Sequence, residues 1–430
     1  MFKHLRLAAL LCIALLPGAN AAAQVAPPRT IALRIGTALD GRGNVIRDRV
    51  ILVVDGKIKA VTRKVPAGVP TYDLRRYTVL PGLIDTHEHI FYHFRDGRFV
   101  DGRLSGLDET PEEAILYAAE NGADILAAGF TTIQSPGRAK DVWLRQAYAR
   151  NVLPGPRVLT SGEWLRFDDP VGSAPPPDRL RAIVRERKAQ GADFIKIFAS
   201  SSARDGSKPL LTQPQMDALC DEARKQGLRT LVHAYTVSVR MAVQAGCTTI
   251  EHGTGGMTPE VIGMMVKAGT YFDPNVGLVV RNYVENRQKY IGIGNYTAAS
   301  MDAMARRLAE NAPPREFMLA LKQPGLKIVF GTDAVAGAHG RNAEEFVYRI
   351  QRGGMDPMRA IVSATSLSAE SLGLGDVTGT LAQGYEADII ALAGDPLKDP
   401  TAVRRPVFVM KHGRVFKFDP VEAAALAEKR

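Results

Sequence analysis

The sequence predicts an α/β protein in which a (β/α)₈ barrel of the TIM type carries a small composite β-sandwich domain built from both termini. The chain has 430 residues, of which 46% are hydrophobic and 23% are charged, as expected for a globular barrel with a satellite domain. Short strand-like segments occupy both ends. The middle, residues 81–375, alternates strand and helix patterns, which favours a parallel barrel.

Residues 1–23 are predicted to be a signal peptide. Lys3 and Arg6 precede an apolar run over residues 7–16, and small residues around Ala21 offer cleavage sites. This run is much shorter than the roughly 20 residues that span a bilayer. We therefore expect an exported, periplasmic protein with no membrane contact after signal cleavage.

Two β-rich segments, residues 24–80 and 376–430, are predicted to form one domain. In the first, apolar runs flank Asp55-Gly56, which is a two-residue hairpin signal. In the second, an apolar run over residues 407–410 returns through His412-Gly413 into another strand. We interpret His412 as a structural residue of that turn.

The barrel segment contains eight strand patterns, and helices are predicted between them. The strands cover residues 80–89, 131–133, 157–160, 194–198, 230–233, 248–252, 270–273 and 327–331. Thr110 and Glu113 flank Pro111 in a capping box that begins one helix. A second helix opens at Thr212 and ends before Gly227.

The net charge limits the classes of binding partner, and the cysteine content limits the possible disulfides. The net charge of +10 comes from basic residues interleaved with acids, so we expect no nucleic-acid partner and a slight preference for anionic substrates. An oxidising compartment permits a bridge between Cys220 and Cys247. Both lie in buried patterns, and we expect two free thiols instead.

Polar residues with metal-binding side chains recur at the predicted strand ends. His87 and His89 are spaced i, i+2 and so share one side of an extended chain. The others are Lys196 in strand four, His233 and His252 at the ends of strands five and six, and Asp333 after strand eight. The carboxyl ends of barrel strands meet on one face, so these six should share a pocket.

Each of these residues also has a structural interpretation. Lys196 could be a buried lysine paired with Asp333, and His252 could be a core histidine. His339 could be an ordinary loop residue. It is much less expected that six such residues fall at strand ends by chance than that they form one shared site.

The motifs resemble those of the amidohydrolase superfamily, in its binuclear branch with a carboxylated lysine. Within it the chain is similar to imidazolonepropionase-like amidohydrolases that act as Xaa-Pro dipeptidases or carboxypeptidases, and to ochratoxin-type amidases. The matching stretches are residues 81–89, 129–132, 194–197, 232–235, 250–253, 331–334 and 379–388. Gln134-Ser135 departs from the family, which often has an Arg-Asp pair there.

The resemblance implies two zinc ions. His87, His89 and Asp333 would bind one ion, and His233 with His252 would bind the other. A carboxylated Lys196 would bridge them, and a hydroxide between the ions would attack the substrate. Asp333 would move the proton, and Tyr235 would donate to an oxyanion or to a substrate carboxylate.

We therefore predict an exported binuclear zinc amidohydrolase that cleaves an amide or peptide bond next to a free carboxylate. A small-molecule or short-peptide substrate is the expected partner, and the sequence is compatible with a homo-oligomer. Tyr235, His339 and Arg281-Asn282-Tyr283 are the candidates for binding the carboxylate. Two alternatives stay open: a cyclic-amide hydrolase or deaminase on the same metals, and a non-catalytic metal-bound binding protein.

Overall fold

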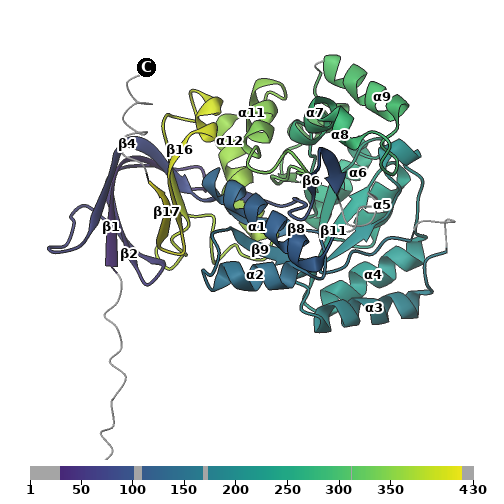
Figure 1. The fold of residues 1–430 in the computed structure, drawn as a ribbon, viewed down its shortest axis with the longest axis horizontal. Helices are drawn as coiled ribbons and strands as arrows, with labels where there is room; N and C mark the ends of the chain where they lie inside the picture. The colour runs from purple at the N-terminus through teal and green to yellow at the C-terminus, as the bar shows by residue number, and fades with distance from the viewer. Residues whose placement is uncertain (1–29, 101–108, 168–172, 311, 419–430) are drawn as a thin grey trace, which may run out of the picture.

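A computed structural model describes residues 30–100, 109–167, 173–310 and 312–418 (Figure 1). The predicted signal peptide lies outside these described residues, so the structure does not bear on it. Among the described helices, none is both long and apolar enough to cross a membrane. Two bodies are visible, a β-domain at the left of Figure 1 and a larger barrel surrounded by helices.

The β-domain is assembled from both ends of the described chain, as predicted. Its strands are β1 (Thr30–Leu39), β2 (Val45–Val54), β3 (Lys57–Thr62), β4 (Thr71–Pro81), β15 (Ile389–Leu392), β16 (Pro406–Lys411) and β17 (Arg414–Phe418). They form one seven-stranded sheet in the order β17-β16-β15-β4-β1-β2-β3. The antiparallel pairing of β15 with β4 joins the C-terminal strands to the N-terminal ones.

This sheet curls until its far ends share one core. Ile58 on β3 and Phe418 on β17, from the two end strands of the sheet, pack in one hydrophobic cluster. The hairpin between β2 and β3 turns at Asp55 and Gly56, both with positive φ, as the sequence predicted. The two packed faces expected of a sandwich are therefore parts of one continuous sheet.

All eight predicted barrel strands are present and parallel. They are β5 (Leu83–Asp85), β8 (Phe130–Ser135), β9 (Arg157–Thr160), β10 (Phe194–Phe198), β11 (Arg229–Ala234), β12 (Thr249–His252), β13 (Tyr271–Asp273) and β14 (Lys327–Ile328). Their ladders run as β5-β8-β9 and β10-β11-β12-β13-β14. Hydrogen bonds of 2.8 Å bridge the two seams, from the Thr86 amide to the Phe330 carbonyl and from the Asp193 amide to the Thr160 carbonyl. The barrel is thereby closed.

Thirteen α-helices accompany the strands in the described residues. They are α1 (Pro111–Ala127), α2 (Asp141–Ala149), α3 (Pro177–Ala189), α4 (Gln213–Lys225), α5 (Val237–Gln244), α6 (Pro259–Ala268), α7 (Leu278–Glu285), α8 (Arg287–Tyr290), α9 (Ala298–Ala309), α10 (Arg315–Leu321), α11 (Ala343–Gln351), α12 (Pro357–Val362) and α13 (Ser368–Ser371). The predicted capping box at Thr110 and Glu113 begins α1. The second predicted helix is α4, which follows Thr212 and buries Met216, Leu219, Cys220 and Ala223.

The connection from β13 to β14 is much longer than a single helix. It contains α7 to α10, which Figure 1 shows in green at the upper right of the barrel. A hairpin of β6 (His93–Arg95) and β7 (Arg98–Val100) packs on this excursion through Phe99, whose ring lies 4.8 Å from that of Tyr290. Together they build an aromatic layer beside the carboxyl ends of the strands.

The expectation of two free thiols is wrong. Cys220 on α4 and Cys247, just before β12, form a disulfide, with their Cα atoms 5.1 Å apart. The sequence patterns correctly placed both residues in the interior. Burial of two side chains does not reveal whether they face each other, because that depends on how α4 packs against the neighbouring strands.

Candidate active site

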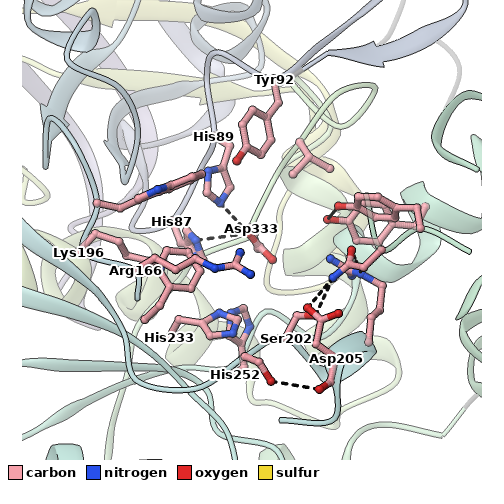
Figure 2. A pocket seen from close by; sticks show the side chains of 18 of the residues that line it. His87, His89, Tyr92, Arg166, Lys196, Ser202, Asp205, His233, His252 and Asp333 are labelled. Atoms are coloured by element: carbon pink, nitrogen blue, oxygen red, sulfur yellow. Dashed lines mark hydrogen bonds and ion pairs between the residues drawn. The ribbon is translucent and has the colours of Figure 1, made fainter. Parts of the chain in front are cut away.

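The six predicted ligand residues line one cavity of about 550 Å³ at the carboxyl ends of the barrel strands. Figure 2 shows His89 above Asp333 and His87 to its left, both directed toward its carboxylate, with His233 and His252 below. The six residues come from five strands or the segments that follow them: His87, His89, Lys196, His233, His252 and Asp333. Barrel closure therefore brings together side chains up to 246 positions apart, from 87 to 333.

His87 and His89 follow β5 rather than lying within it. A bridge between Glu88 and Ala334 keeps this segment extended, so the two imidazoles still point to the same side. Their Nε2 atoms lie 3.3 Å and 3.2 Å from Oδ1 of Asp333. This group of three forms a compact set of potential metal ligands.

His233 and His252 approach from β11 and β12, with their ring centroids 4.6 Å apart. His252 and Asp333 both adopt positive φ, at 65° and 54°. Such a backbone is uncommon for residues with a Cβ atom, and it tends to occur at functional sites. The left-handed conformation turns each chain at the strand end and directs the side chain into the cavity.

Lys196 is buried in β10 and pairs with Glu251 of β12, not with Asp333. Glu251 also lies 2.7 Å from Nδ1 of His87. Sequence reasoning missed this carboxylate, because it precedes His252 and strict alternation would turn one of the two away. Within the described residues, His87, Glu251 and His252 make a second set of potential ligands.

Three of the four ligand histidines are held in the neutral form that binds metals. Burial lowers the pKa of His89 and of His252 to about 4, and it lowers the pKa of His233 well below its usual value. His87 differs: burial opposes its charge, but Glu251 and Asp333 outweigh that effect and raise its pKa. Neutral imidazoles beside carboxylates are the donor set that suits zinc.

Buried ring nitrogens of three ligand histidines, His87, His89 and His233, lack a hydrogen-bond partner among the described residues. Nε2 of His233 is buried and has no hydrogen-bond partner among the described residues. Leaving such a group unpaired is costly, so a ligand at this position would compensate. Burial opposes ionisation of Asp333, but nearby imidazoles outweigh it and hold its pKa well below its usual value. The residues present therefore fit a divalent metal centre.

A buried network fastens the two ligand-bearing segments together. Asp85 accepts hydrogen bonds from the Thr332 hydroxyl at 2.7 Å and from the His87 amide at 3.0 Å. Asn342 donates to both Asp85 and Glu88, at 2.7 Å and 2.8 Å. The segment carrying His87 and the segment before Asp333 are thus held in register.

Tyr235 lies where the sequence placed it, just after β11. Its ring stacks on His252, with centroids 5.3 Å apart and planes 6° from parallel. Burial is the main cause that raises the pKa of its hydroxyl, so the hydroxyl remains a hydrogen-bond donor. The position is compatible with the predicted donor role, which stays a prediction.

Three of the other predicted carboxylate-binding residues do not face the site. His339 is buried and bonded to Glu88 at 2.9 Å and to the Tyr92 carbonyl at 2.8 Å, so it braces the network behind the ligands. Arg281 lies 3.6 Å from Glu344 and lines neither of the two cavities at the site. Asn282 is also turned away, since its amide donates to the Ala336 carbonyl. Tyr283 alone in that cluster reaches the site.

A second cavity of about 580 Å³ adjoins the first. Its walls are largely apolar and come from α7, α9 and α10. The first cavity is bordered by aromatic and cationic groups, among them Trp164, Arg166 and Arg204, which the sequence gave no reason to select. Six residues line both cavities: Ser202, Arg204, His233, His252, Tyr283 and Asp333. Three of the six predicted metal ligands, His233, His252 and Asp333, therefore lie at the junction of the two cavities.

The amidohydrolase family model matches residues 78–416, which covers most of the chain and all of the ligand residues. The chain belongs to the amidohydrolase family. Members of this family generally bind a metal centre, and this amidohydrolase has ligand groups to hold one. It is a hydrolase acting on carbon–nitrogen bonds.

Individual proteins similar to this chain are consistent with its membership of the amidohydrolase family. The ochratoxinase of Aspergillus niger is 27% identical over 429 residues, covering 89% of this chain and 85% of the relative. The imidazolonepropionase of Anaeromyxobacter dehalogenans is 25% identical, covering 84% and 87%. A solved Xaa-Pro dipeptidase with methionine bound in its active site is 27% identical, with a TM-score of 0.77, and covers 90% of this amidohydrolase and 100% of that chain. Amide and peptide hydrolysis is therefore the chemistry supported for this fold and site.

Proposed function

We propose that this amidohydrolase is a zinc-dependent amidase or peptidase that cleaves the amide bond next to a free carboxylate. The observation that carries the proposal is the meeting of two large cavities at one set of metal ligands. A substrate with a group on each side of its scissile bond fits that arrangement. Similarity to a dipeptidase and to an ochratoxinase supports short peptides and N-acyl amino acids as the substrate class.

The roles of the chain's own residues follow from their positions. Two zinc ions, when bound by His87, His89, His233, His252, Asp333 and a carboxylated Lys196, would polarise the scissile carbonyl and activate water. Asp333 accepts the proton of the attacking water at its carboxylate and passes it to the leaving amine. The Tyr235 hydroxyl donates to the developing oxyanion or to the carboxylate of the substrate.

Carboxylation of Lys196 is part of the proposal. Nζ of the neutral amine attacks carbon dioxide, a nitrogen–carbon bond forms, and one amine proton leaves to solvent. The product is an anionic carbamate with two oxygens. Lys196 has only 1% of its surface exposed and lines the cavity beside the ligand histidines, so metal ions held there would stabilise the anionic carbamate.

Export is the second part of the proposal. The signal-like pattern of residues 1–23 motivates it, and the disulfide between Cys220 and Cys247 supports an oxidising compartment. Expression with the native N-terminus, followed by fractionation, should recover protein beginning near residue 24 outside the cytoplasm. Recovery of full-length protein from the cytoplasm alone would argue against export.

Turnover of a substrate panel tests the activity. Dipeptides and N-acyl amino acids, each with its C-terminal amide, should be incubated with metal-loaded and metal-depleted enzyme and analysed by mass spectrometry. Free acids should be cleaved preferentially, and only by the metal-loaded protein. Equal cleavage of acids and amides would remove the carboxylate requirement.

A cyclic-amide hydrolase or deaminase is the second candidate, because imidazolonepropionase is among the relatives. Cyclic amides and aminated heterocycles therefore belong in the same panel. Turnover restricted to these compounds would favour the cyclic-amide hydrolase or deaminase. Binding without turnover of any member would favour a binding protein.

A further inference from the structure

Arg204 stands where the two cavities meet. It belongs to a short 3₁₀ turn, Ala203–Asp205, in the connection from β10 to α4. Like His233, His252 and Asp333, it lines both cavities. A side chain at this junction can contact the part of the substrate that adjoins the scissile bond.

The guanidinium of Arg204 is held in a fixed orientation. Its Nε donates to Oδ1 of Asn295 at 3.0 Å, and its Cζ lies 4.3 Å from the ring centroid of Tyr296. Asn295 in turn donates to Asp205 at 2.7 Å and to Ser202 at 3.1 Å. These contacts fix the guanidinium before a substrate arrives, which reduces the entropy lost on binding.

Arg204 lacks an anionic partner within the described chain. Among the described residues, no carboxylate forms an ion pair with Arg204, and its two terminal nitrogens make no hydrogen bond. The contrast is Lys196, whose ammonium group in the same cavity pairs with Glu251. A sequestered cation without an anion is unfavourable, so a ligand that supplies an anion is expected there.

The surroundings of Arg204 also keep it charged. Burial disfavours the cation, but the hydroxyls of Tyr296 and Tyr283 and the Asp333 carboxylate outweigh that effect and raise its pKa. A guanidinium presents two parallel N–H groups that match the two oxygens of a carboxylate. The missing partner therefore has the chemistry of a carboxylate.

We propose that Arg204 binds the free carboxylate of the substrate and thereby determines selection of acids over amides. This assignment rests on the proposed function. With the carboxylate at the junction, the scissile amide lies beside Asp333, and the acyl group and the amino-acid side chain extend into different cavities. Both groups can then be bulky.

Arg204→Gln and Arg204→Lys test the assignment with N-benzoyl-L-phenylalanine and its C-terminal amide. Loss of a charge-assisted pair should lower kcat/KM for the acid roughly 10- to 100-fold in Arg204→Gln, mainly through KM. Cleavage of the amide should change by less than about 3-fold. Arg204→Lys keeps the charge and should restore part of the preference.

Arg306→Gln is the matched control, because Arg306 is an exposed arginine of α9 that lines neither cavity. It should keep the wild-type preference for the acid. Arg166→Gln removes the other arginine of the first cavity. Loss of acid preference in Arg166→Gln but not in Arg204→Gln would overturn the assignment, as would equal losses on acid and amide in Arg204→Gln.

Binding separates failure of the assignment from failure of the proposed function. Calorimetric titration with L-phenylalanine and L-phenylalaninamide measures carboxylate recognition without turnover. Wild-type protein should bind the acid more tightly, and Arg204→Gln should lose that difference. If this holds while no amide is hydrolysed, the proposed function fails and the carboxylate site stands. Unchanged preference in Arg204→Gln refutes the site even in an active enzyme.

Discussion

The barrel strands and the helical excursion α7 to α10 contribute to one site in different ways. The strands deliver buried histidines, a lysine and a carboxylate to fixed positions that hydrogen bonds across the barrel support. The excursion delivers apolar and aromatic walls such as Val279, Tyr283 and Met304. The difference indicates that the strand ends determine the reaction, whereas the connection after β13 determines which substrates fit.

The largest effect is expected from Lys196→Met. Methionine fills the space but supplies no anionic oxygen, so bound metal and activity should both fall to background. Elemental analysis and kcat measure the two effects, and Lys196→Ala with added short-chain carboxylic acids should recover part of each.

Lys411→Met is the control for loss of a buried lysine. Lys411 on β16 donates to the Gly155 carbonyl at 2.7 Å, far from the ligands in the fold. This variant should be less stable and still retain metal. Full metal content and activity in Lys196→Met would show that the strands do not supply a bridging lysine.

Asp333→Asn should produce the next largest effect. The amide keeps one oxygen ligand but cannot accept a proton, so kcat should fall roughly 10²- to 10⁴-fold. Metal content is measured on the same preparation. Near-normal kcat with normal metal would exclude Asp333 as the proton carrier and leave it only a ligand role.

Ala303→Trp tests the excursion and should have a smaller effect. Ala303 on α9 lines the second cavity, and an indole there would occupy space that a bulky substrate needs. We expect kcat/KM for bulky substrates to fall roughly 10-fold, with metal content and turnover of small substrates unchanged. Ala298→Trp, on the same helix but outside the cavity lining, should resemble the wild type. Equal losses for small and bulky substrates would mean that α9 does not contribute to selectivity.

Replacing both Cys220 and Cys247 with serine should affect activity least. The bridge spans 27 positions, and loss of such a constraint should lower the free energy of unfolding by roughly 3 kcal/mol. Neither cysteine lines either cavity, so kcat at moderate temperature should be unchanged. Thermal unfolding with and without reductant measures the contribution. A wild-type protein insensitive to reductant would show that the bridge contributes little.

Local patterns by themselves determined the strands, the composite β-domain and the six ligand-type residues. Each depends on short-range rules: alternation along a strand, a capping box at Thr110, and histidines at the ends of apolar runs. The convergence of strand ends in a barrel then placed residues as distant as His87 and Asp333 together. No contact between them had to be known in advance.

Only the tertiary structure decided which side chains contact one another. It paired Lys196 with Glu251, joined Cys220 to Cys247 and turned His339 away from the site. It also left Arg204 at the junction of the cavities with no ion-pair partner among the described carboxylates. These outcomes depend on how loops and helices pack across long distances in sequence. Periodicity reports whether a side chain is buried, but its partner is fixed only when the whole chain closes around it.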